Sequence, residues 1–526
     1  MRICPSFFSC LNSNALSRFF GLGQKGDEKM YRKISTAIFT SGVFVLLFGV
    51  SCFGQTGTKI ELSHFEYKGA FRMPKGNLGG DSTRGNSLSY GGSALTYNPL
   101  RNSLFIVGHP HERMVVEISI PEIVQSTNIN NLKTAGVLQA PSNITNGNWD
   151  NLKMDGGAVG NGARPGGFLV HNNKLIGSSW AYYDGGKEAA RSHFVASPDW
   201  RSTGTQFRGM YRVGQHPVTS GAVNGGFVGG YMAPVPEEWQ PALGGPALTG
   251  MAALAIVSRT SLGPCAWVFD PNDVGEKDPA PATMLVGYPI QYPTLGAYGD
   301  SASLYYNRAT EVRGIVFPEG GSSVLFFGRH GLGKTGKGDS CYGSGTKDPA
   351  LHGTEVPGTN GVKYCYDPTD ATKGVHAYPY VYRIWAYDAH QFVKVKNGTV
   401  NPSTGQSYQP WDVIPYAIWD ITFPFAVEDA HILGVAYDPS TQRIFISQQS
   451  GERYGVEPFP LIQVFQLEFS GSGVGSGTSG GSKATPPSQP SRPQRPNLNE
   501  ERRKYVPPTT PVTPSRTDDR TRSYSR

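Results

Sequence analysis

Charged residues are scarce in this chain, and long surface helices are hard to build without them. Only 17% of the 526 residues are Asp, Glu, Lys or Arg, whereas there are 67 glycines and 40 prolines. Glycine and proline interrupt helices and favour turns between short strands. Because 38% of the residues are apolar, the chain can bury a substantial core. The composition therefore predicts an all-β fold.

The signatures of several enzyme and metal-site classes are absent from the central part of the chain. There is no Ser-centred nucleophile elbow, no H-E-x-x-H helix and no C-x-x-C pair. These patterns would place a nucleophile on a strained turn, two imidazoles on one helix face, or two thiolates around zinc. Their absence disfavours the corresponding hydrolase, zinc-protease and thiolate-zinc interpretations.

The central part also lacks the positive charge that a nucleic acid would require. The whole sequence holds 47 Lys+Arg and 40 Asp+Glu, a formal net charge of +7. Residues 1–54 contribute 6 basic and 2 acidic residues and residues 471–526 contribute 10 and 4, which leaves 31 and 34 in residues 55–470. That body is slightly acidic, so we expect no nucleic-acid partner.

The first 54 residues have the pattern of an export signal. A short basic segment at residues 31–33 precedes an apolar run at residues 38–50, and small residues lie before a cut at Gln55. The pattern predicts Met30 as the true start and a secreted or periplasmic protein, with no transmembrane span after cleavage. Two alternatives stay open, namely an uncleaved anchor and a lipid attached to Cys52.

Cleavage would leave three cysteines in a compartment where disulfides persist. Cys341 and Cys365 flank one Gly-rich segment and are the natural pair. Closing that loop would contribute roughly 3 kcal/mol by restricting the unfolded chain. Cys265 has no partner left, and we expect it to be a small buried residue.

The composition changes again at the end of the body. From Gly471 to the last residue, Gly and Ser give way to Pro, Arg, Ser and Thr, with only two tyrosines as aromatics. Such a segment cannot bury enough apolar surface to offset its ordering entropy. We expect residues 471–526 to be a disordered tail.

A repeated pattern runs through the body. It consists of a strand, an Asx-Pro turn, a second strand, a loop and a third strand. The turn is marked by an Asn or Asp, which accepts backbone hydrogen bonds, and by a proline, which fixes φ. Two clear copies and three weaker ones occur at residues 95–99 with 104–106, 435–439 with 444–446, 314–318 with 324–327, 168–172 with 175–176, and 252–257 with 266–269.

This pattern resembles the blades of NHL-like and YVTN-like β-propellers. The resemblance implies a closed ring of blades, because propellers use radial repetition to protect their sheet edges. The length of the body allows roughly six to eight blades with long loop insertions. A pair of β-sandwiches is the alternative architecture. The whole chain also resembles exported bacterial proteins of no assigned activity, which implies no particular function.

A string resembling a phosphate-binding loop occupies residues 328–335, after an apolar run at residues 324–327. A true P-loop must open a helix whose N-terminus binds the phosphates. Here the chain continues Gly-Lys-Gly-Asp-Ser-Cys, which disfavours a helix. We therefore expect a flexible loop closed by the disulfide and no nucleotide.

Histidines and carboxylates suggest two polar sites. His109 and His111 flank a proline, and on extended backbone their rings could share a divalent cation. Residues 428–431 place two carboxylates beside His431, which suits a cation site, acid–base work or the capping of a turn. Solvated loop histidines are the plain alternative for the first pair.

The repeat alignment makes a stronger positional prediction. Residues that follow the second strand of a unit should all emerge at one face of a propeller, together with the loop that enters the last unit. Polar and aromatic side chains would converge there around the axis, as in a binding site on a rigid scaffold. The residues are His109, Trp180, Arg329, His330, Gln448, Asp429 and His431.

Two classes of function fit these features. The preferred one is an exported, non-catalytic propeller that binds a glycan, a peptide or a partner protein through this loop face. The alternative is a metal-assisted hydrolase or lyase acting on an extracellular substrate, with His109, His111, Asp429 and His431 as its polar groups. We prefer the binding module because no catalytic constellation is legible in the sequence.

Overall fold

The computed structural model describes residues 57–80, 85–214, 225–258, 260–290, 292, 294–299 and 302–469. The predicted signal segment, its cleavage point, Cys52 and the predicted tail lie outside the described residues. Within the described part, no helix is long and apolar enough to cross a membrane.

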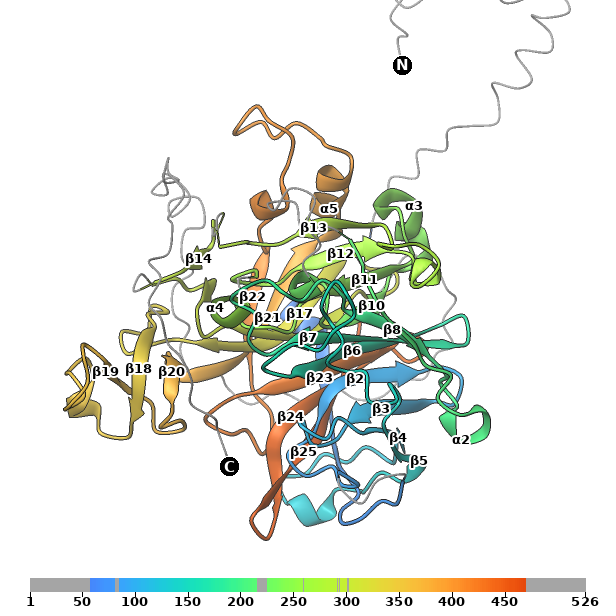
Figure 1. Cartoon of the computed structure of the whole chain (residues 1–526), viewed down its shortest axis with the longest axis horizontal. Coiled ribbons are helices and arrows are strands. Elements are labelled where there is room, and N and C mark those ends of the chain that lie inside the picture. Colours follow the sequence, from blue (N-terminus) through green and yellow to red (C-terminus); the bar gives the residue numbers. More distant parts are fainter. Residues whose placement is uncertain are drawn as a thin grey trace, which may run out of the picture. The chain divides into compact units, whose positions relative to one another are not determined.

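The described residues form five four-stranded antiparallel sheets, which we call blades 1 to 5 (Figure 1). The first four are built from consecutive strands, apart from an insertion in blade 4. Blade 5 is formed by the last strands of the body but takes its outermost strand from the beginning of the body. In order of hydrogen bonding, the strands are β2 (Ser93–Asn98), β3 (Ser103–Val107), β4 (Val115–Ser119) and β5 (Val137–Ser142) in blade 1; β6 (Ala163–His171), β7 (Lys174–Ala181), β8 (His193–Ala196) and β9 (Arg208–Tyr211) in blade 2; β10 (Met232–Pro234), β11 (Ala247–Gly250), β12 (Ala266–Phe269) and β13 (Ala282–Val286) in blade 3; β16 (Glu311–Val316), β17 (Ser323–Gly331), β21 (Tyr380–Asp388) and β22 (Ala417–Ile421) in blade 4; and β23 (Ile432–Asp438), β24 (Arg443–Tyr454), β25 (Glu457–Leu467) and β1 (Phe65–Arg72) in blade 5.

Small elements decorate the connections. A parallel pair and a three-stranded sheet lie in insertions, and the latter projects at the left of Figure 1. The remaining strands are β14 (Gly296–Ala297), β15 (Tyr306–Asn307), β18 (Cys341–Thr346), β19 (Lys363–Tyr366) and β20 (Lys373–His376). The α-helices are α2 (Trp200–Thr203), α3 (Gln240–Leu243), α4 (Ala255–Ser258) and α5 (Ala389–Lys396), and single 3-10 turns occupy Leu62–His64, Ile129–Asn131, Gly225–Phe227, Glu237–Trp239, Pro271–Asp273, Pro349–Leu351 and Pro410–Asp412.

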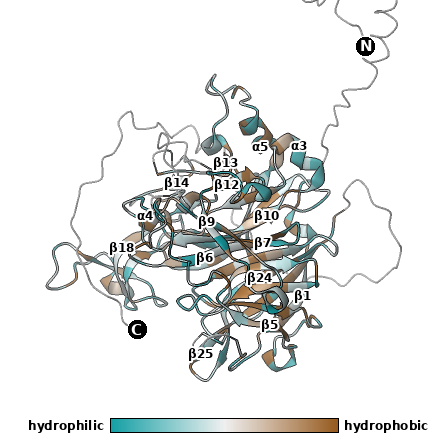
Figure 2. Ribbon diagram, turned by 45° about the vertical axis from the view of Figure 1, so that its right-hand side comes forward, coloured by the Kyte–Doolittle hydropathy of each residue, from teal (hydrophilic) through white to brown (hydrophobic). Residues whose placement is uncertain are grey.

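The core lies between the blades, and its distribution shows that the ring is closed. Successive side chains of a strand point to opposite faces of its sheet. In β3, Leu104 and Ile106 pack in a cluster shared with blade 5, whereas Phe105 and Val107 pack in a cluster shared with blade 2. Three further clusters fill the gaps between blades 2 and 3, 3 and 4, and 4 and 5. Every blade therefore has a buried hydrophobic face on both sides, and hydrophobic residues, drawn brown, lie within the strands, for example around β24 in Figure 2.

The last blade joins the two ends of the body. Strand β1 pairs antiparallel with β25 from Phe65 opposite Leu467 to Arg72 opposite Leu461, with one bulge between Tyr67 and Gly69. This pairing supplies the fourth strand of blade 5 and leaves blade 5 in contact with blade 1. The all-β propeller prediction is confirmed.

The blade number corrects the sequence prediction. The described residues hold five blades rather than six to eight, because the insertions between strands take up much of the chain. The segment predicted as a strand at residues 252–257 is also not one. It follows β11 and leads into α4, whereas blade 3 begins at β10 and uses residues 266–269 as its third strand.

Glycines allow the first strands of the blades to approach closely around the axis. A Cβ on Gly434 of β23 would lie 2.6 Å from the backbone nitrogen of Leu95 in β2, and one on Gly314 of β16 would lie 2.4 Å from Cβ of Val435. Both distances are shorter than real Cβ contacts allow. The absence of a side chain at these positions is thus a steric requirement of the ring.

The predicted disulfide between Cys341 and Cys365 is confirmed, with 5.7 Å between the two Cα atoms. It joins β18 to β19 in the insertion of blade 4. A buried network ties this insertion to the blade, because the Asp367 carboxylate accepts hydrogen bonds from the Tyr380 hydroxyl at 2.7 Å and from Nδ1 of His376 at 3.0 Å. These bonds hold the pKa of Asp367 well below its usual range, against the opposing effect of burial.

The segment that resembled a P-loop is not followed by the helix that a true P-loop opens. Residues 328–331 end strand β17, and the next element of the described chain is strand β18 rather than a helix. The backbone N–H groups of Lys334 and Thr335 donate instead to the Asp339 carboxylate at 3.1 and 3.0 Å. The loop therefore satisfies its own donors and does not form a phosphate cradle.

We predict that Gly434→Ala lowers the free energy of unfolding by about 1–3 kcal/mol, because the added methyl group overpacks the contact between β23 and β2. Urea denaturation measures the change. Gly374→Ala is the matched control, since a Cβ on Gly374 in strand β20 has nothing within 4 Å. Equal stability of the two variants would contradict the close approach at the axis.

A second prediction concerns the remaining thiol. Cys265 is fully buried, and burial raises the pKa of its thiol, against the hydrogen bond that it accepts from the Trp267 indole N–H at 3.2 Å. Thiolate is the reactive form, so a thiol reagent should label no cysteine of the native body at neutral pH. Mass spectrometry before and after unfolding in denaturant checks this, and one label per body should appear only after unfolding.

Candidate functional site

The predicted residues gather near one end of the ring. The first strands of the five blades are β2, β6, β10, β16 and β23. We call the end of the ring at which these strands begin the proximal face, and the second strands end there too. Contacts between blades show that these ends coincide. Glu311 begins β16, and its carboxylate lies 3.5 Å from Nδ1 of His431, the residue before β23. Arg113 follows β3, and it donates to the backbone oxygen of Ala163 at the start of β6.

Strand register explains why separate segments meet there. In blade 2 Arg164 lies opposite Trp180, in blade 4 Glu311 lies opposite Arg329, and in blade 5 Ile432 lies opposite Gln448. Each pair joins the start of a first strand to the residue opposite it in the second strand, which lies near the strand end in blades 2 and 4 and in the middle of β24 in blade 5. The three positions are therefore equivalent in their blades.

A buried carboxylate anchors the centre of the proximal face. Glu311 Oε1 accepts from Nη2 of Arg329 at 2.8 Å, and its Oε2 accepts from Nη2 of Arg313 at 2.9 Å. The Glu311 side chain is only 8% exposed. Burial raises its pKa, but Arg329, His431 and Arg313 together hold that pKa well below the usual range. The carboxylate is therefore ionised at neutral pH, where a general acid would need its proton.

The two arginines are held by other groups as well. The guanidinium of Arg329 lies 4.3 Å from the ring centroid of Tyr380, and it donates to Nε2 of His431 at 2.7 Å and to the backbone oxygen of Asp429 at 3.1 Å. Arg313 lies 5.5 Å from the ring centroid of Trp180. Each arginine thus combines an ion pair with a cation–π contact, which fixes its position.

Positive charge exceeds negative charge towards blades 1 and 2. Arg113 is paired with the Asp150 carboxylate at 2.7 Å. Arg164 stacks on Tyr182 at 5.1 Å and donates to the backbone oxygen of Ala163 at 3.1 Å. Among the described residues Arg164 has no carboxylate partner, and its partial burial lowers the pKa of its guanidinium.

His109 and His111 lie beside this arginine, but not on extended backbone. The amide nitrogens of Glu112 and Arg113 both bond to the carbonyl oxygen of His109, so the segment is a tight turn that joins β3 to β4. The two rings are still neighbours, with centroids 5.5 Å apart. Burial, together with the nearby cations, lowers the pKa of His111. No group of three or more potential metal ligands occurs in the described part of the chain.

Two predicted residues point into the interior instead. His330 is fully buried, and its Nδ1 lies 3.0 Å from the Thr310 hydroxyl. The alternation along β17 explains this, because the residue after Arg329 faces the other side of the strand. Gln448 is also fully buried, and its Oε1 accepts from Nε2 of Gln463 at 2.7 Å. Both side chains serve packing in this structure.

Asp429 contacts the central cluster through its backbone, but one of its side-chain oxygens is buried. Its backbone oxygen binds Arg329, whereas its Oδ1 is buried and has no hydrogen-bond partner among the described residues. Asp429 and His431 therefore belong to the same cluster as Glu311, through Arg329.

Exposed tyrosines were not anticipated from the sequence, and they concentrate on this side. The described residues include seven tyrosines exposed by more than a third. Five of them lie in connections that begin or end at the proximal face, Tyr342 lies in strand β18 of the insertion between β17 and β21, and Tyr454 is the last residue of β24. The opposite connections, between first and second or third and fourth strands, contain none in the described ranges. The seven are Tyr90, Tyr182, Tyr183, Tyr292, Tyr298, Tyr342 and Tyr454.

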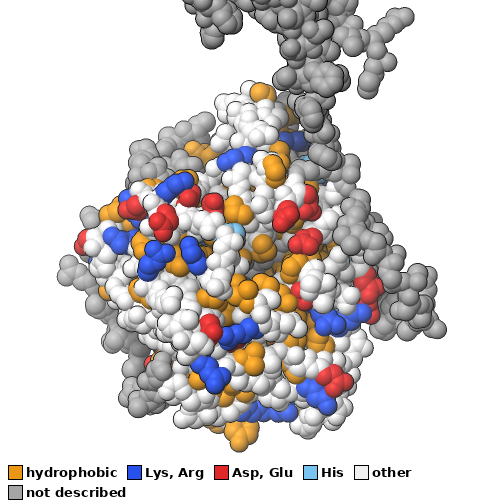
Figure 3. All heavy atoms as spheres, turned by 90° about the vertical axis from the view of Figure 1, so that its right-hand side faces the viewer, with side chains coloured by type: hydrophobic (Ala, Val, Ile, Leu, Met, Phe, Trp, Pro, Cys, Tyr) orange, Lys and Arg blue, Asp and Glu red, His pale blue; other side chains and the backbone are white. Residues whose placement is uncertain are grey.

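Two of these rings, those of Tyr90 and Tyr182, belong to a row over blades 1 and 2 that includes His109, His111 and Arg164. The ring of Tyr90 lies 5.7 Å from that of His109, which is followed by His111. Tyr182 continues the row, with its ring 6.2 Å from that of Trp180. On the side of the molecule drawn in Figure 3, by contrast, basic and acidic side chains are interspersed.

No family model matches, and no curated protein matches. Among solved structures, a GH43 endo-arabinanase from Bacillus licheniformis aligns at 11% identity over 75% of this chain and 96% of that chain, with a TM-score of 0.33. A glycosyl hydrolase from Bacteroides ovatus aligns at 10% identity over 78% and 96%, with a TM-score of 0.34, and a luciferin-regenerating enzyme at 7% over 74% and 95%, with a TM-score of 0.30. Similarities this low assign neither a family nor an activity.

We predict that Glu311→Gln destabilises the protein by about 3–5 kcal/mol at pH 7, because it leaves two buried guanidinium groups without their counter-charge. The folded pKa of Glu311 is depressed, so its stabilising contribution is present above the unfolded pKa of about 4.3. That contribution is lost as the pH falls from there towards the folded pKa.

The stability difference between wild type and Glu311→Gln should therefore be largest at neutral pH and shrink below about pH 4.3. Urea denaturation at a series of pH values measures it. A difference that stays constant from pH 7 to pH 3 would show that Glu311 is not held by these charges.

Proposed function

We propose that this protein is an exported β-propeller that binds a glycan at its proximal face without chemically changing it. The observation that carries the proposal is that Tyr90, Tyr182 and Tyr183 are exposed in connections at the proximal face, whereas the opposite connections hold no tyrosine exposed by more than a third in the described ranges. Tyrosine offers a flat apolar ring and a polar hydroxyl, which suits a ligand with both apolar C–H faces and hydroxyl groups. A sugar ring has this dual character.

The row over blades 1 and 2 supplies the contact surface. Tyr90, Tyr182 and Tyr183 are each about half exposed, at 47%, 49% and 53%, and so can stack on a ligand. His109 and Arg164 lie between them and can donate hydrogen bonds to ring oxygens and hydroxyls. Aromatic rings with a few fixed polar groups are typical of small-ligand sites.

The central cluster supports the row as a rigid base. Trp180 and Glu311 are nearly buried, and Arg313 connects them by stacking on the first and pairing with the second. A binding site gains affinity when its groups are held in place before the ligand arrives. The ion pairs of Glu311 serve that purpose across blades 2, 4 and 5.

Catalysis is the second candidate, as a metal-assisted hydrolase or lyase. The neighbouring imidazoles of His109 and His111 favour it, since a divalent cation could bridge them. The ionised state of Glu311 weighs against Glu311 as a proton donor. Metal analysis of the purified protein separates the two functions, and a stoichiometric cation lost on His109→Ala would support the enzyme.

Export is part of the proposal. The Cys341–Cys365 disulfide in the body fits an oxidising compartment, and so does the signal-like pattern in residues 31–54. If the ligand is a peptide or a partner protein rather than a glycan, the site stays at the same place and the binding test gives a different result.

We predict that replacing Tyr182 and Tyr183 together by alanine weakens glycan binding about tenfold or more, since each aromatic contact contributes about 0.5–1.5 kcal/mol beyond the area that it buries. Binding of the full secreted chain to an array of soluble oligosaccharides, followed by calorimetry on the glycans that bind, measures the effect.

Val400→Ala is the control, because Val400 is 62% exposed and lies between the third and fourth strands of blade 4, a connection on the opposite side. It should bind as wild type does, and all variants should melt at nearly the same temperature. Unchanged affinity in the double tyrosine variant would exclude the proximal row as the glycan site.

A further inference from the structure

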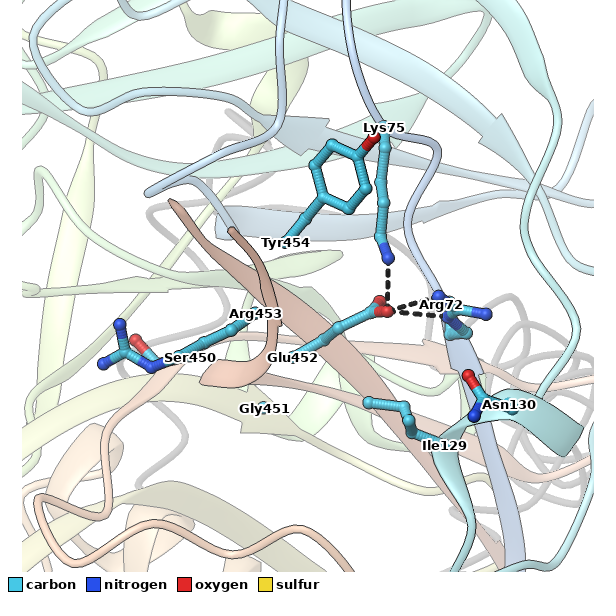
Figure 4. A pocket seen from close by; sticks show the side chains of 9 residues that line it. All are labelled: Arg72, Lys75, Ile129, Asn130, Ser450, Gly451, Glu452, Arg453 and Tyr454. Atoms are coloured by element: carbon cyan, nitrogen blue, oxygen red, sulfur yellow. Dashed lines mark hydrogen bonds and ion pairs between the residues drawn. The ribbon is translucent and has the colours of Figure 1, made fainter. Parts of the chain in front are cut away.

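A pocket with its own charges lies at the outer rim of blade 5, apart from the central cluster. Its cavity measures about 480 Å³, within the size range of small-molecule sites. It is formed by the end of β1, the turn at Ile129–Asn131 and the tip of the β24–β25 hairpin, as Figure 4 shows. Its lining residues are Arg72, Lys75, Ile129, Asn130, Ser450, Gly451, Glu452, Arg453 and Tyr454.

Glu452 is a buried carboxylate at the base of this pocket, with a side chain that is only 3% exposed. Its Oε1 accepts from Nε of Arg72 at 2.9 Å and also from Nζ of Lys75. Its Oε2 is equally buried, yet it has no hydrogen-bond partner among the described residues. An unpaired buried oxygen of this kind costs free energy until a donor reaches it.

The pocket also has more positive than negative charge. Arg72 and Lys75 lie beside a single carboxylate, whereas the side chain of Arg453 points away from that carboxylate (Figure 4) and has no ion-pair partner in the described part of the chain. Lys75 lies over the ring of Tyr454 at 5.0 Å, and that ring remains 61% exposed. The site thus offers a cationic edge, one acceptor oxygen and one apolar surface.

We propose that this pocket binds a hydroxylated carboxylate the size of one sugar, such as a hexuronic acid. A ligand hydroxyl would donate to Glu452 Oε2, which no residue of the described chain satisfies. The ligand carboxylate would pair with Arg72 and Lys75, whose charges together exceed the single charge of Glu452. The apolar face of the sugar ring would lie on Tyr454.

A purely structural role for Glu452 explains only half of these features. The bonds from Arg72 and Lys75 to Oε1 join the hairpin to β1 and stabilise blade 5. They leave Oε2 without a donor and place two cations beside one anion, whereas a ligand that is both a donor and an anion would meet both conditions.

The test uses the full chain and D-glucuronate, with D-glucose and acetate as comparison ligands. Calorimetry should show glucuronate binding at least about tenfold more tightly than either, because glucose lacks the charge and acetate lacks the hydroxyls. Equal binding of acetate or of sulfate would reduce the pocket to a simple anion site and overturn the proposal.

Arg453→Glu reverses one charge on an exposed side chain without touching Glu452. It should weaken glucuronate binding by at least about tenfold, and added salt should weaken the wild type in the same direction. Arg201→Glu is the matched control on the exposed surface of α2, and it should change nothing. Unchanged binding in Arg453→Glu would place the ligand elsewhere.

Glu452→Gln adds a second measurement. It retains one acceptor oxygen and places an amide beside it, so it should reduce the preference for glucuronate over acetate while acetate itself binds no more weakly. The Tyr182 and Tyr183 double variant should bind glucuronate as wild type does, because the two sites share no residue. A negative result for glycan binding at the proximal face can therefore be distinguished from a negative result for glucuronate binding at this pocket.

Discussion

The pairing of β1 with β25 is the interaction on which the rest of the structure depends. It gives blade 5 its outer strand and joins the beginning of the body to its end. Each gap between blades is filled by side chains from both neighbours, so an open ring would expose a hydrophobic face on each terminal blade. The small volume of glycine at Gly314 and Gly434 lets the first strands close around the axis.

A closed ring brings together residues that are far apart in the sequence. Trp180, Glu311 and His431 belong to three blades, yet Arg313 and Arg329 connect them through ion pairs and stacking contacts. Burying the Glu311 carboxylate without a partner would cost free energy. Glu311 can therefore lie at the axis only because the two guanidinium groups pair with it. The same rigidity makes the proximal face a suitable base for the exposed tyrosines.

Much of this architecture could be read from the sequence, and the exceptions have physical causes. The Asx-Pro turns marked the strand pairs of blades 1 and 5, but blade 3 begins with a strand of only three residues at Met232–Pro234, which leaves little signal. Aligning the ends of the second strands found Trp180 and Arg329, but not their cross-strand partners Arg164 and Glu311, which only the register reveals. The alternation of side chains along β17 places His330 inside. Exposure distinguishes a tyrosine that can stack on a ligand from a tyrosine in the core, and the residue type alone does not determine it.

The central claim is that ligand binding takes place at the end of the ring where the first strands begin. Hydrogen–deuterium exchange of the full chain, with and without a binding oligosaccharide, tests it directly because it needs no substitution. The account predicts slower exchange on binding in peptides that cover residues 88–93, 180–184 and 427–432, and no change at residues 99–102 and 172–173, which join first to second strands. Protection confined to the latter turns would contradict it.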